Sequence, residues 1–272
     1  EALWDAARAG ARLLTHLRAL PGITFSDAAE GFARYTDPDG GLWAIDQEYR
    51  HYVCASQAVH VDDVLTDLDR HVENAYRDDY LRPLSRTWDD ALPSSSGRID
   101  SFHRLLVAGT HRRTVVIISD ALRYEAGVEL ADHLRSLGRG AVAVNPWYTM
   151  LPSITALGMA ALLPHRELTL GVRGKDQVVV ETDGQSSAGI DARRTILEGA
   201  DGRAFTYEEL KQDTIKVMRS KFKGASAVYI YHDVIDATGD HAASESGTPD
   251  AVNRAIDELS GLVGKLISAD IT

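Results

Sequence analysis

The chain has 272 residues, 44% hydrophobic and 25% charged, as expected for a soluble globular protein of one large or two modest domains. Its formal net charge of −11 excludes a broad basic face for duplex DNA, although a local basic groove remains compatible with it. One cysteine excludes an internal disulfide, and the absence of an apolar run of membrane-spanning length or a signal peptide predicts a cytoplasmic protein. Because the first residue is not Met, we expect a piece of a longer polypeptide.

The N-terminal part of the chain predicts a helical region. Apolar residues recur at helical spacing in residues 3–17 and again in residues 64–75, which indicates amphipathic helices. The polar, glycine-containing stretch 92–97 is the best linker candidate. We therefore expect residues 1–97 to form a helical N-terminal region and residues 98–272 to form an α/β domain.

A buried strand followed by a helix is the clearest signal in the chain. Residues 114–118 (TVVII) are all β-branched, and a helical period containing Leu130 and Leu134 follows them. Asp120 comes where this strand ends, at the edge where open α/β sheets bind their ligands. This stretch alone favours an N-cap role for Asp120 over metal binding, because aspartate often accepts hydrogen bonds from free backbone N–H groups.

The remaining sequence predicts further strands and helices. We expect a short helix over 99–109, strands over 141–145, 178–180 and 225–231, a long surface excursion within 165–205, and helices between Pro152 and Pro164, over 207–222 and over 251–267. Thr155 falls at or near the first turn of the helix that follows Pro152. The strand over 225–231 runs into a segment that is dense in side chains able to bind metal: His232, Asp236, Asp240 and His241.

Three loops at predicted strand ends carry groups that would converge if they lie on one edge of one sheet. These groups are Asp120, Thr155, and Asp236 with Asp240. Carboxylate and imidazole ligands suit zinc, manganese or magnesium, and such an ion would activate the Thr155 hydroxyl as a nucleophile. Each residue also has an ordinary structural explanation, as an N-cap, a turn former or a surface residue. Their joint occurrence favours a chemical site.

Three motifs occur in order over roughly residues 99–272: SDALRY at 119–124, LPSITALGM at 151–159 and YHDVIDATGD at 231–240. Together they resemble the PglZ domain, a member of the alkaline phosphatase superfamily found in bacterial phage-defence systems of the BREX and phage-growth-limitation types. The resemblance implies an α/β fold of the alkaline-phosphatase-like three-layer sandwich type. The helical lead-in, with Tyr49-Arg50 and Trp88, is more loosely similar to the segment that precedes such domains.

The same resemblance implies a two-metal site with a serine or threonine nucleophile. Asp120 matches the first metal-binding aspartate, and Thr155 matches the nucleophile, which also contacts metal. Asp236 matches the aspartate of an Asp-x-x-Gly-His type motif, in which Asp240 replaces the final His. This replacement moves the metal preference from zinc towards manganese or magnesium. His241 is one residue out of register as a substitute.

Two further candidates follow from the same motifs. His232 is a candidate ligand, and Arg123 is a candidate for holding a substrate oxygen, although a structural ion pair is the commoner role for such an arginine. The superfamily also supplies ligands from an Asp-His-Gly type motif after the next strand, which is absent before the chain stops at Thr272. We therefore expect a sandwich truncated at its C-terminal side, weak divalent-metal binding and little hydrolysis by this fragment.

Two functions are compatible with this pattern in the complete protein. The first is a metal-dependent phosphoesterase or phosphodiesterase that acts on a nucleotide or nucleic acid. The second is a catalytically inert scaffold within the defence complex. Both imply other subunits of that complex as partners and no membrane. A nucleotide-binding module is less well supported, because no glycine-rich phosphate loop follows Ile118.

Overall fold

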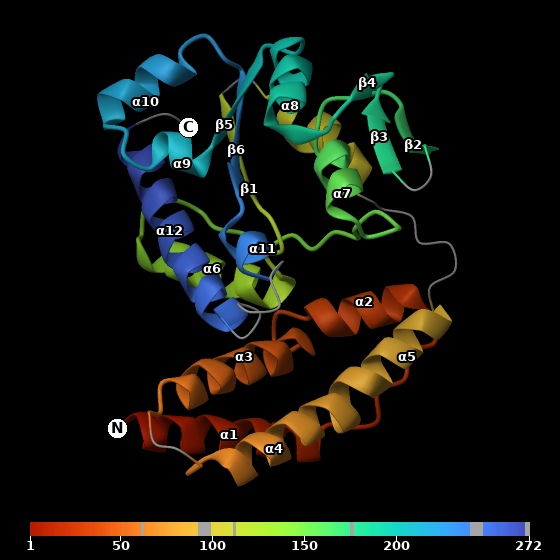
Figure 1. The fold of residues 1–272 in the computed structure, drawn as a ribbon, viewed down its shortest axis with the longest axis vertical. Helices are drawn as coiled ribbons and strands as arrows, with labels where there is room; N and C mark the ends of the chain where they lie inside the picture. Colours follow the sequence, from red (N-terminus) through yellow and green to blue (C-terminus); the bar gives the residue numbers. More distant parts are fainter. Residues whose placement is uncertain (61–62, 92–98, 111–112, 175–176, 240–246, 270–272) are drawn as a thin grey trace.

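The computed structural model describes residues 1–60, 63–91, 99–110, 113–174, 177–239 and 247–269. Residues up to 91 form a bundle of helices, below the rest of the molecule in Figure 1. Its elements are α1 (Ala2–Ala19), α2 (Ala28–Thr36), α3 (Trp43–Gln57), α4 (Thr66–Ala75), η1 (Tyr76–Leu81) and α5 (Arg82–Ala91). The predicted linker at 92–97 lies outside the described residues, so the proposed domain boundary stays a prediction.

The bundle is held together by apolar stripes on α1, α3, α4 and η1. Leu13, Val72 and Tyr80 have no exposed surface and pack in one cluster with Tyr52. α1 and α3 approach closely, because a Cβ atom added at Gly10 would lie 2.8 Å from the Tyr52 ring. The helical spacing of apolar residues in the sequence therefore corresponds to a buried interface.

A parallel sheet forms the centre of the second part of the molecule. Its strands are β1 (Thr114–Ser119), β6 (Ala227–His232) and β5 (Gly202–Thr206), in the order β1-β6-β5. Every residue of the central strand β6 is buried. The strands predicted from the apolar runs at 114–118 and 225–231 are confirmed, and the fold is mixed α/β.

Helices pack against both faces of this sheet. Val228 and Ile230 of β6 contact one set of helices, and Tyr229 and Tyr231 contact the other. The first set comprises α9 (Tyr207–Leu210), α10 (Ile215–Phe222) and α12 (Thr248–Ser268), and the second comprises η3 (His103–Val107), α7 (Thr155–Ala161) and α8 (Gly189–Glu198). α6 (Tyr124–Ser136) and α11 (Val234–Gly239) pack on α12. No helix among the described residues is long and apolar enough to cross a membrane.

A small antiparallel sheet lies beside α7. It consists of β2 (Leu168–Arg173), β3 (Gln177–Thr182) and β4 (Gln185–Ser186), in that order. Val180 of β3 packs against Leu157 and Ala160 of α7, which connects this sheet to the helix that begins at Thr155. The strand predicted over 178–180 is confirmed within β3.

Four sequence predictions differ from the structure. Residues 141–145 form no strand, since this stretch makes none of the sheet pairings found in the described structure. The region 165–205 is no surface excursion, because it contains α8 and the core strand β5. The helix over 207–222 is two helices, since Thr206 and Thr214 each accept a hydrogen bond that begins a new helix. The helix over 99–109 is two short turns, η2 (Ile99–Ser101) and η3.

Candidate functional site

Asp120 lies directly after β1, at the carboxyl end of the parallel sheet. Its backbone N–H donates to the carbonyl of His232 at 2.8 Å, which extends the pairing between β1 and β6 by one residue. Its side chain accepts from the N–H of Ala121, a residue with a left-handed φ of 60°. The N-cap prediction is wrong, because α6 begins at Tyr124 and its N-cap is Arg123. The Asp120 carboxylate is therefore held at the sheet edge.

Asp236 lies across this edge, on α11 just after β6. Burial raises the pKa of the Asp120 carboxyl group, and the neighbouring carboxylates of Asp236 and Asp233 raise it further. The N–H of Ala121 and the guanidinium of Arg193 act in the opposite direction. The structure thus brings the predicted ligands Asp120 and Asp236 together. Two like charges in a partly buried position would be relieved by a cation between them.

Thr155 is the first residue of α7, as the position of Pro152 predicted. The N-cap of this helix is Ile154, so the alternative that Thr155 is itself the cap is wrong. Thr155 is exposed, and its helix is anchored to the sheet through Met159, which packs with Tyr229. Its side chain makes no hydrogen bond to Asp120 or Asp236 within the described structure.

His232 is buried, with 1% of its surface exposed. One ring nitrogen, Nδ1, lies 2.9 Å from Ser119 Oγ, and the other, Nε2, lies 2.9 Å from a carboxylate oxygen of Glu258. In this arrangement the imidazole joins β1, β6 and α12, and neither nitrogen is directed at the two aspartates. Asp240 and His241 lie outside the described residues. Within the part of the chain that the structure describes, no three His, Cys, Asp or Glu side chains are grouped so that they could hold a metal ion.

A cavity of about 460 Å³ adjoins the sheet edge and is lined on its other side by the helical region. Arg123 and Asp236 line it from the α/β part, and Asp46, Arg50 and Tyr76 line it from α3 and η1. Arg123 is exposed and lies close enough to Tyr76 to act on its titration: burial and Asp46 raise the pKa of Tyr76, and Arg123 opposes them. The helical region therefore contributes directly to the surroundings of the predicted site.

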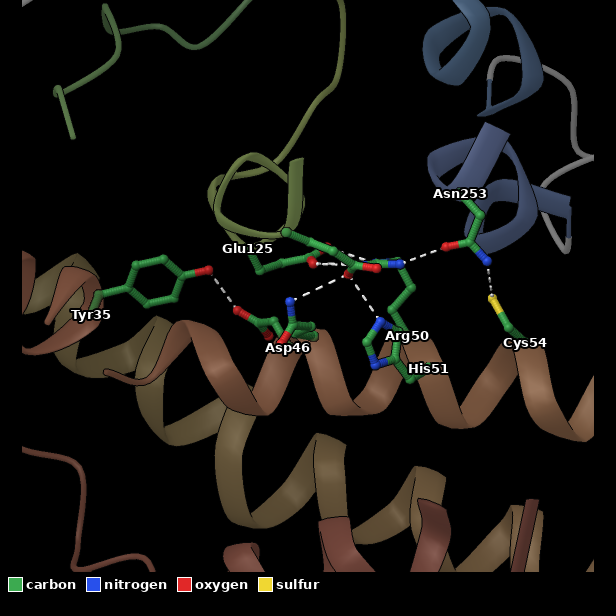
Figure 2. Close-up of polar contacts among 9 residues, drawn as sticks. Tyr35, Asp46, Arg50, His51, Cys54, Glu125 and Asn253 are labelled. Atoms are coloured by element: carbon green, nitrogen blue, oxygen red, sulfur yellow. Dashed lines mark hydrogen bonds and ion pairs between the residues drawn. The ribbon is translucent and has the colours of Figure 1, made fainter. Parts of the chain in front are cut away.

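A buried cluster around Arg50 connects the two parts of the chain (Figure 2). Arg50 is 6% exposed, and its Nε and Nη2 atoms donate to Glu125 of α6 at 3.1 and 2.8 Å. Nη1 donates to Asn253 of α12 at 2.8 Å, and Nη2 also contacts Glu129. Sequence reasoning missed this cluster. Two signals for it are present in the sequence: the looser resemblance at Tyr49-Arg50, which named no partner for the arginine, and the position of Arg50 between the apolar residues Ile45 and Tyr52 of α3.

Glu129 is the more exposed of the two carboxylates that contact Arg50. Burial alone would raise the pKa of Glu129, but hydrogen bonds from His51 and Arg50 outweigh burial and lower it to about 2. Gln47 donates to the same carboxylate at 3.3 Å. The cluster is thus a charged pairing in which a carboxylate stays ionised over most of the pH range.

Comparisons with known proteins show the family of this chain. Residues 101–271 match the family model described as the BREX system PglZ alkaline phosphatase-like domain. The chain is 34% identical over 285 aligned positions to the alkaline phosphatase-like protein BrxZ of Escherichia coli O9:H4 (strain HS), covering 98% of this chain. It is 33% identical over 238 positions to the alkaline phosphatase-like protein PglZ of Bacillus cereus (strain H3081.97), covering 82% of this chain. It spans 32% and 27% of the lengths of these two relatives.

Proposed function

This chain belongs to the PglZ family of BREX-system alkaline phosphatase-like proteins, and on that premise we propose that it carries part of a metal-dependent phosphoesterase. The complete protein would act in a bacterial anti-phage system together with other subunits of that system. The observation that supports the proposal best is the pair Asp120 and Asp236: each follows a neighbouring parallel strand, β1 or β6, and Asp236 is near enough to raise the pKa of the Asp120 carboxyl group. Open α/β sheets bind their ligands at the carboxyl ends of such strands.

The donor set fits a hard divalent cation. Asp120 and Asp236 offer carboxylate oxygens, which suit manganese and magnesium and also serve zinc. When bound, the cation supplies Lewis-acid stabilisation of the negative charge that develops on a phosphoryl group. We further propose that Asp240 completes this set, and that the remaining ligands and layers of a three-layer sandwich come from outside these 272 residues.

Three residues take roles in the proposed reaction. Thr155 would attack the phosphorus atom with its hydroxyl oxygen and lose its proton, while the P–O bond to the leaving alcohol breaks; water would then cleave the phosphothreonine ester. Thr155 suits this role because it is exposed at the first turn of a helix anchored to the sheet. Arg123 holds a non-bridging oxygen of the substrate, since its side chain is exposed in the cavity beside Asp236. The substrate class we propose is a phosphodiester of a nucleotide or nucleic acid.

Replacement of Thr155 by alanine tests the proposal. We expect Thr155→Ala in the complete protein to lower Mn²⁺-dependent hydrolysis of bis-p-nitrophenyl phosphate by about three orders of magnitude or more, because the nucleophile is lost. Thr155→Ser should retain part of the activity. Thr195→Ala, at an exposed threonine of α8, is the matched control and should leave the rate unchanged.

The same experiment separates the enzyme from an inert scaffold. Hydrolysis at the wild-type rate by Thr155→Ala would contradict the proposed nucleophile. If, in addition, phage defence remained intact in cells that carry this variant, the scaffold function would be supported instead.

A further inference from the structure

The Arg50 cluster is built into the elements that follow both predicted ligands. Glu125 lies in the first turn of α6, and only four residues separate it from Asp120. Asn253 lies near the start of α12, the helix that follows the segment after Asp236. Arg50 bonds to both side chains. A single guanidinium from the helical region therefore binds both α6, just after Asp120, and α12 (Figure 2). α12 in turn packs on α11, the helix of Asp236, through Val252 and Ile235.

The backbone conformation of the segment between Asp120 and Glu125 requires that both of its ends are held in place. Ala121 has a left-handed φ of 60°, which costs conformational energy for a residue with a side chain. Such a conformation persists only where the surroundings over-determine it. β1 holds one end through the bond from the Asp120 N–H to the carbonyl of His232, and Arg50 holds the other end through Glu125.

We propose that Arg50 is a positioning residue for the metal site. It acts through Glu125 on the segment that carries Asp120 and Arg123, and through Asn253 on α12, which packs on α11 with Asp236. This inference rests on the proposed function, because it assumes that Asp120 and Asp236 bind a cation. The N-terminal helical region is then a structural part of the site. Loss of Arg50 leaves Glu125, which is 2% exposed, as a buried charge without this partner, and the start of α6 must shift to hydrate it.

Co²⁺ binding to the complete protein tests this role, because the visible absorption of Co²⁺ reports coordination geometry as well as occupancy. We expect Arg50→Met to weaken Co²⁺ binding about 10-fold or more and to change the band shape. Arg50→Lys should give an intermediate result, because an ammonium group restores the charge but cannot make the two-pronged contact with Glu125.

The chain offers a matched control on the other side of the sheet. Arg194 of α8 makes an arginine–glutamate ion pair with Glu209, in which Nη2 donates to both carboxylate oxygens at 2.6 and 2.7 Å, although this pair is more exposed than that of Arg50. We expect Arg194→Met to leave the Co²⁺ affinity and spectrum unchanged. An equal change in both variants would mean that the Arg50 effect is a general loss of stability, and it would overturn the inference.

Asp120→Asn distinguishes failure of the inference from failure of the proposed function. If wild type binds no Co²⁺, or if Asp120→Asn binds it as wild type does, the proposed metal site fails and the inference fails with it. If Asp120→Asn loses binding and Arg50→Met keeps wild-type affinity and spectrum, the metal site stands and the positioning role is overturned.

A double variant covers the case in which Arg50→Met does not fold. Arg50→Met with Glu125→Met replaces a buried ion pair by apolar side chains, an exchange that folded proteins often tolerate. It removes the clamp without leaving a charge at position 125. The inference predicts weakened Co²⁺ binding and an altered spectrum for this protein, and wild-type behaviour would overturn it.

Discussion

Polar side chains in the interior of the helical region have hydrogen-bond partners. Asp46 accepts hydrogen bonds from the hydroxyl groups of Tyr35 at 2.6 Å, Tyr76 at 2.7 Å and Tyr80 at 3.1 Å. Burial and the Asp46 charge together raise the pKa values of these three tyrosines, so each remains a donor at neutral pH. Arg50 is likewise matched by carboxylates and an amide. Such fully paired groups fix the positions of their helices, because a buried donor or acceptor without a partner is costly.

Glu129 makes a testable contribution to stability at acid pH. Its folded-state pKa of about 2 lies below the ordinary value of 4.5. A lowered carboxyl pKa stabilises the fold above the ordinary value, and this stability is lost as the pH falls from about 5 towards 2. Between pH 7 and pH 3, we expect the free energy of unfolding of Glu129→Gln, measured with urea, to fall by about 2 kcal/mol less than that of wild type. At pH 7 the variant should be less stable than wild type.

Asp132 supplies the comparison on the same helix. Among the described residues it pairs with Arg135 at the surface, where its side chain is 66% exposed, and exposed ion pairs contribute little. The free energy of unfolding of Asp132→Asn should therefore change with pH as that of wild type does. If Glu129→Gln also showed the wild-type pH dependence, the strong pairing of Glu129 with His51 and Arg50 would be refuted.

At the scale of elements, contiguous apolar runs were predictable and mixed sequences were not. β1 and β6 contain uninterrupted runs of β-branched and aromatic residues, 114–118 and 228–231, so their strands and their carboxyl ends could be located from the sequence. β5 has the sequence GRAFT and follows a stretch rich in Gly, Ser and Asp, so its place in the core sheet had no local signal. Residues 141–145 show the reverse case, since an apolar run forms a strand only where a neighbouring backbone can pair with it.

The attachment of α7 to β6 gives a prediction at this scale. The buried hydroxyl of Tyr229 donates to the carbonyl of Leu162, the C-cap of α7, at 2.9 Å. We expect Tyr229→Phe to lower the free energy of unfolding by about 1–2 kcal/mol, because this half-buried contact loses its donor. Urea denaturation would measure the difference.

Tyr231 provides a matched control two residues later on the same face of β6. Its buried hydroxyl donates no hydrogen bond in the described part of the chain, and its polar neighbour is the Arg193 guanidinium, 4.9 Å from the ring centroid, whose charge acts to lower the pKa of Tyr231. Tyr231→Phe should be nearly neutral, because it removes a polar atom that gains little from its surroundings. Equal losses in both variants would argue against a specific role for the bond to α7.

At the scale of the whole molecule, the helical region and the α/β part meet through polar contacts and through aromatic pairs such as Phe32 with Tyr148, whose ring centroids lie 4.2 Å apart. Besides the Arg50 cluster, Tyr124 donates to the carbonyl of Thr36 and Tyr148 donates to the carbonyl of Ala28. The residues joined by these bonds and by those of Arg50 lie 75 to 203 positions apart in the sequence. No local pattern predicts such contacts, which explains why the ends of β1 and β6 were foreseen and the contribution of α3 was not.

Arg50→Met should separate the unfolding of the two parts. Removing one partner from a buried pair costs about 3–5 kcal/mol, and here the cost falls on the contact between the helical region and α6. We expect differential scanning calorimetry to show two transitions for Arg50→Met. Wild type and Arg194→Met should each show one. A single transition for Arg50→Met would show that other contacts are sufficient to couple the two parts.

The strand order β1-β6-β5 affects how the protein can fold while it is being translated. β1 is an edge strand among the described strands and pairs with β6, and Ser119 and His232 of these strands are 113 residues apart. During translation the run TVVII must leave the ribosome long before its pairing partner exists. For that interval it is an exposed, β-prone segment, so the nascent chain should be a substrate for holding chaperones until residue 232 has emerged.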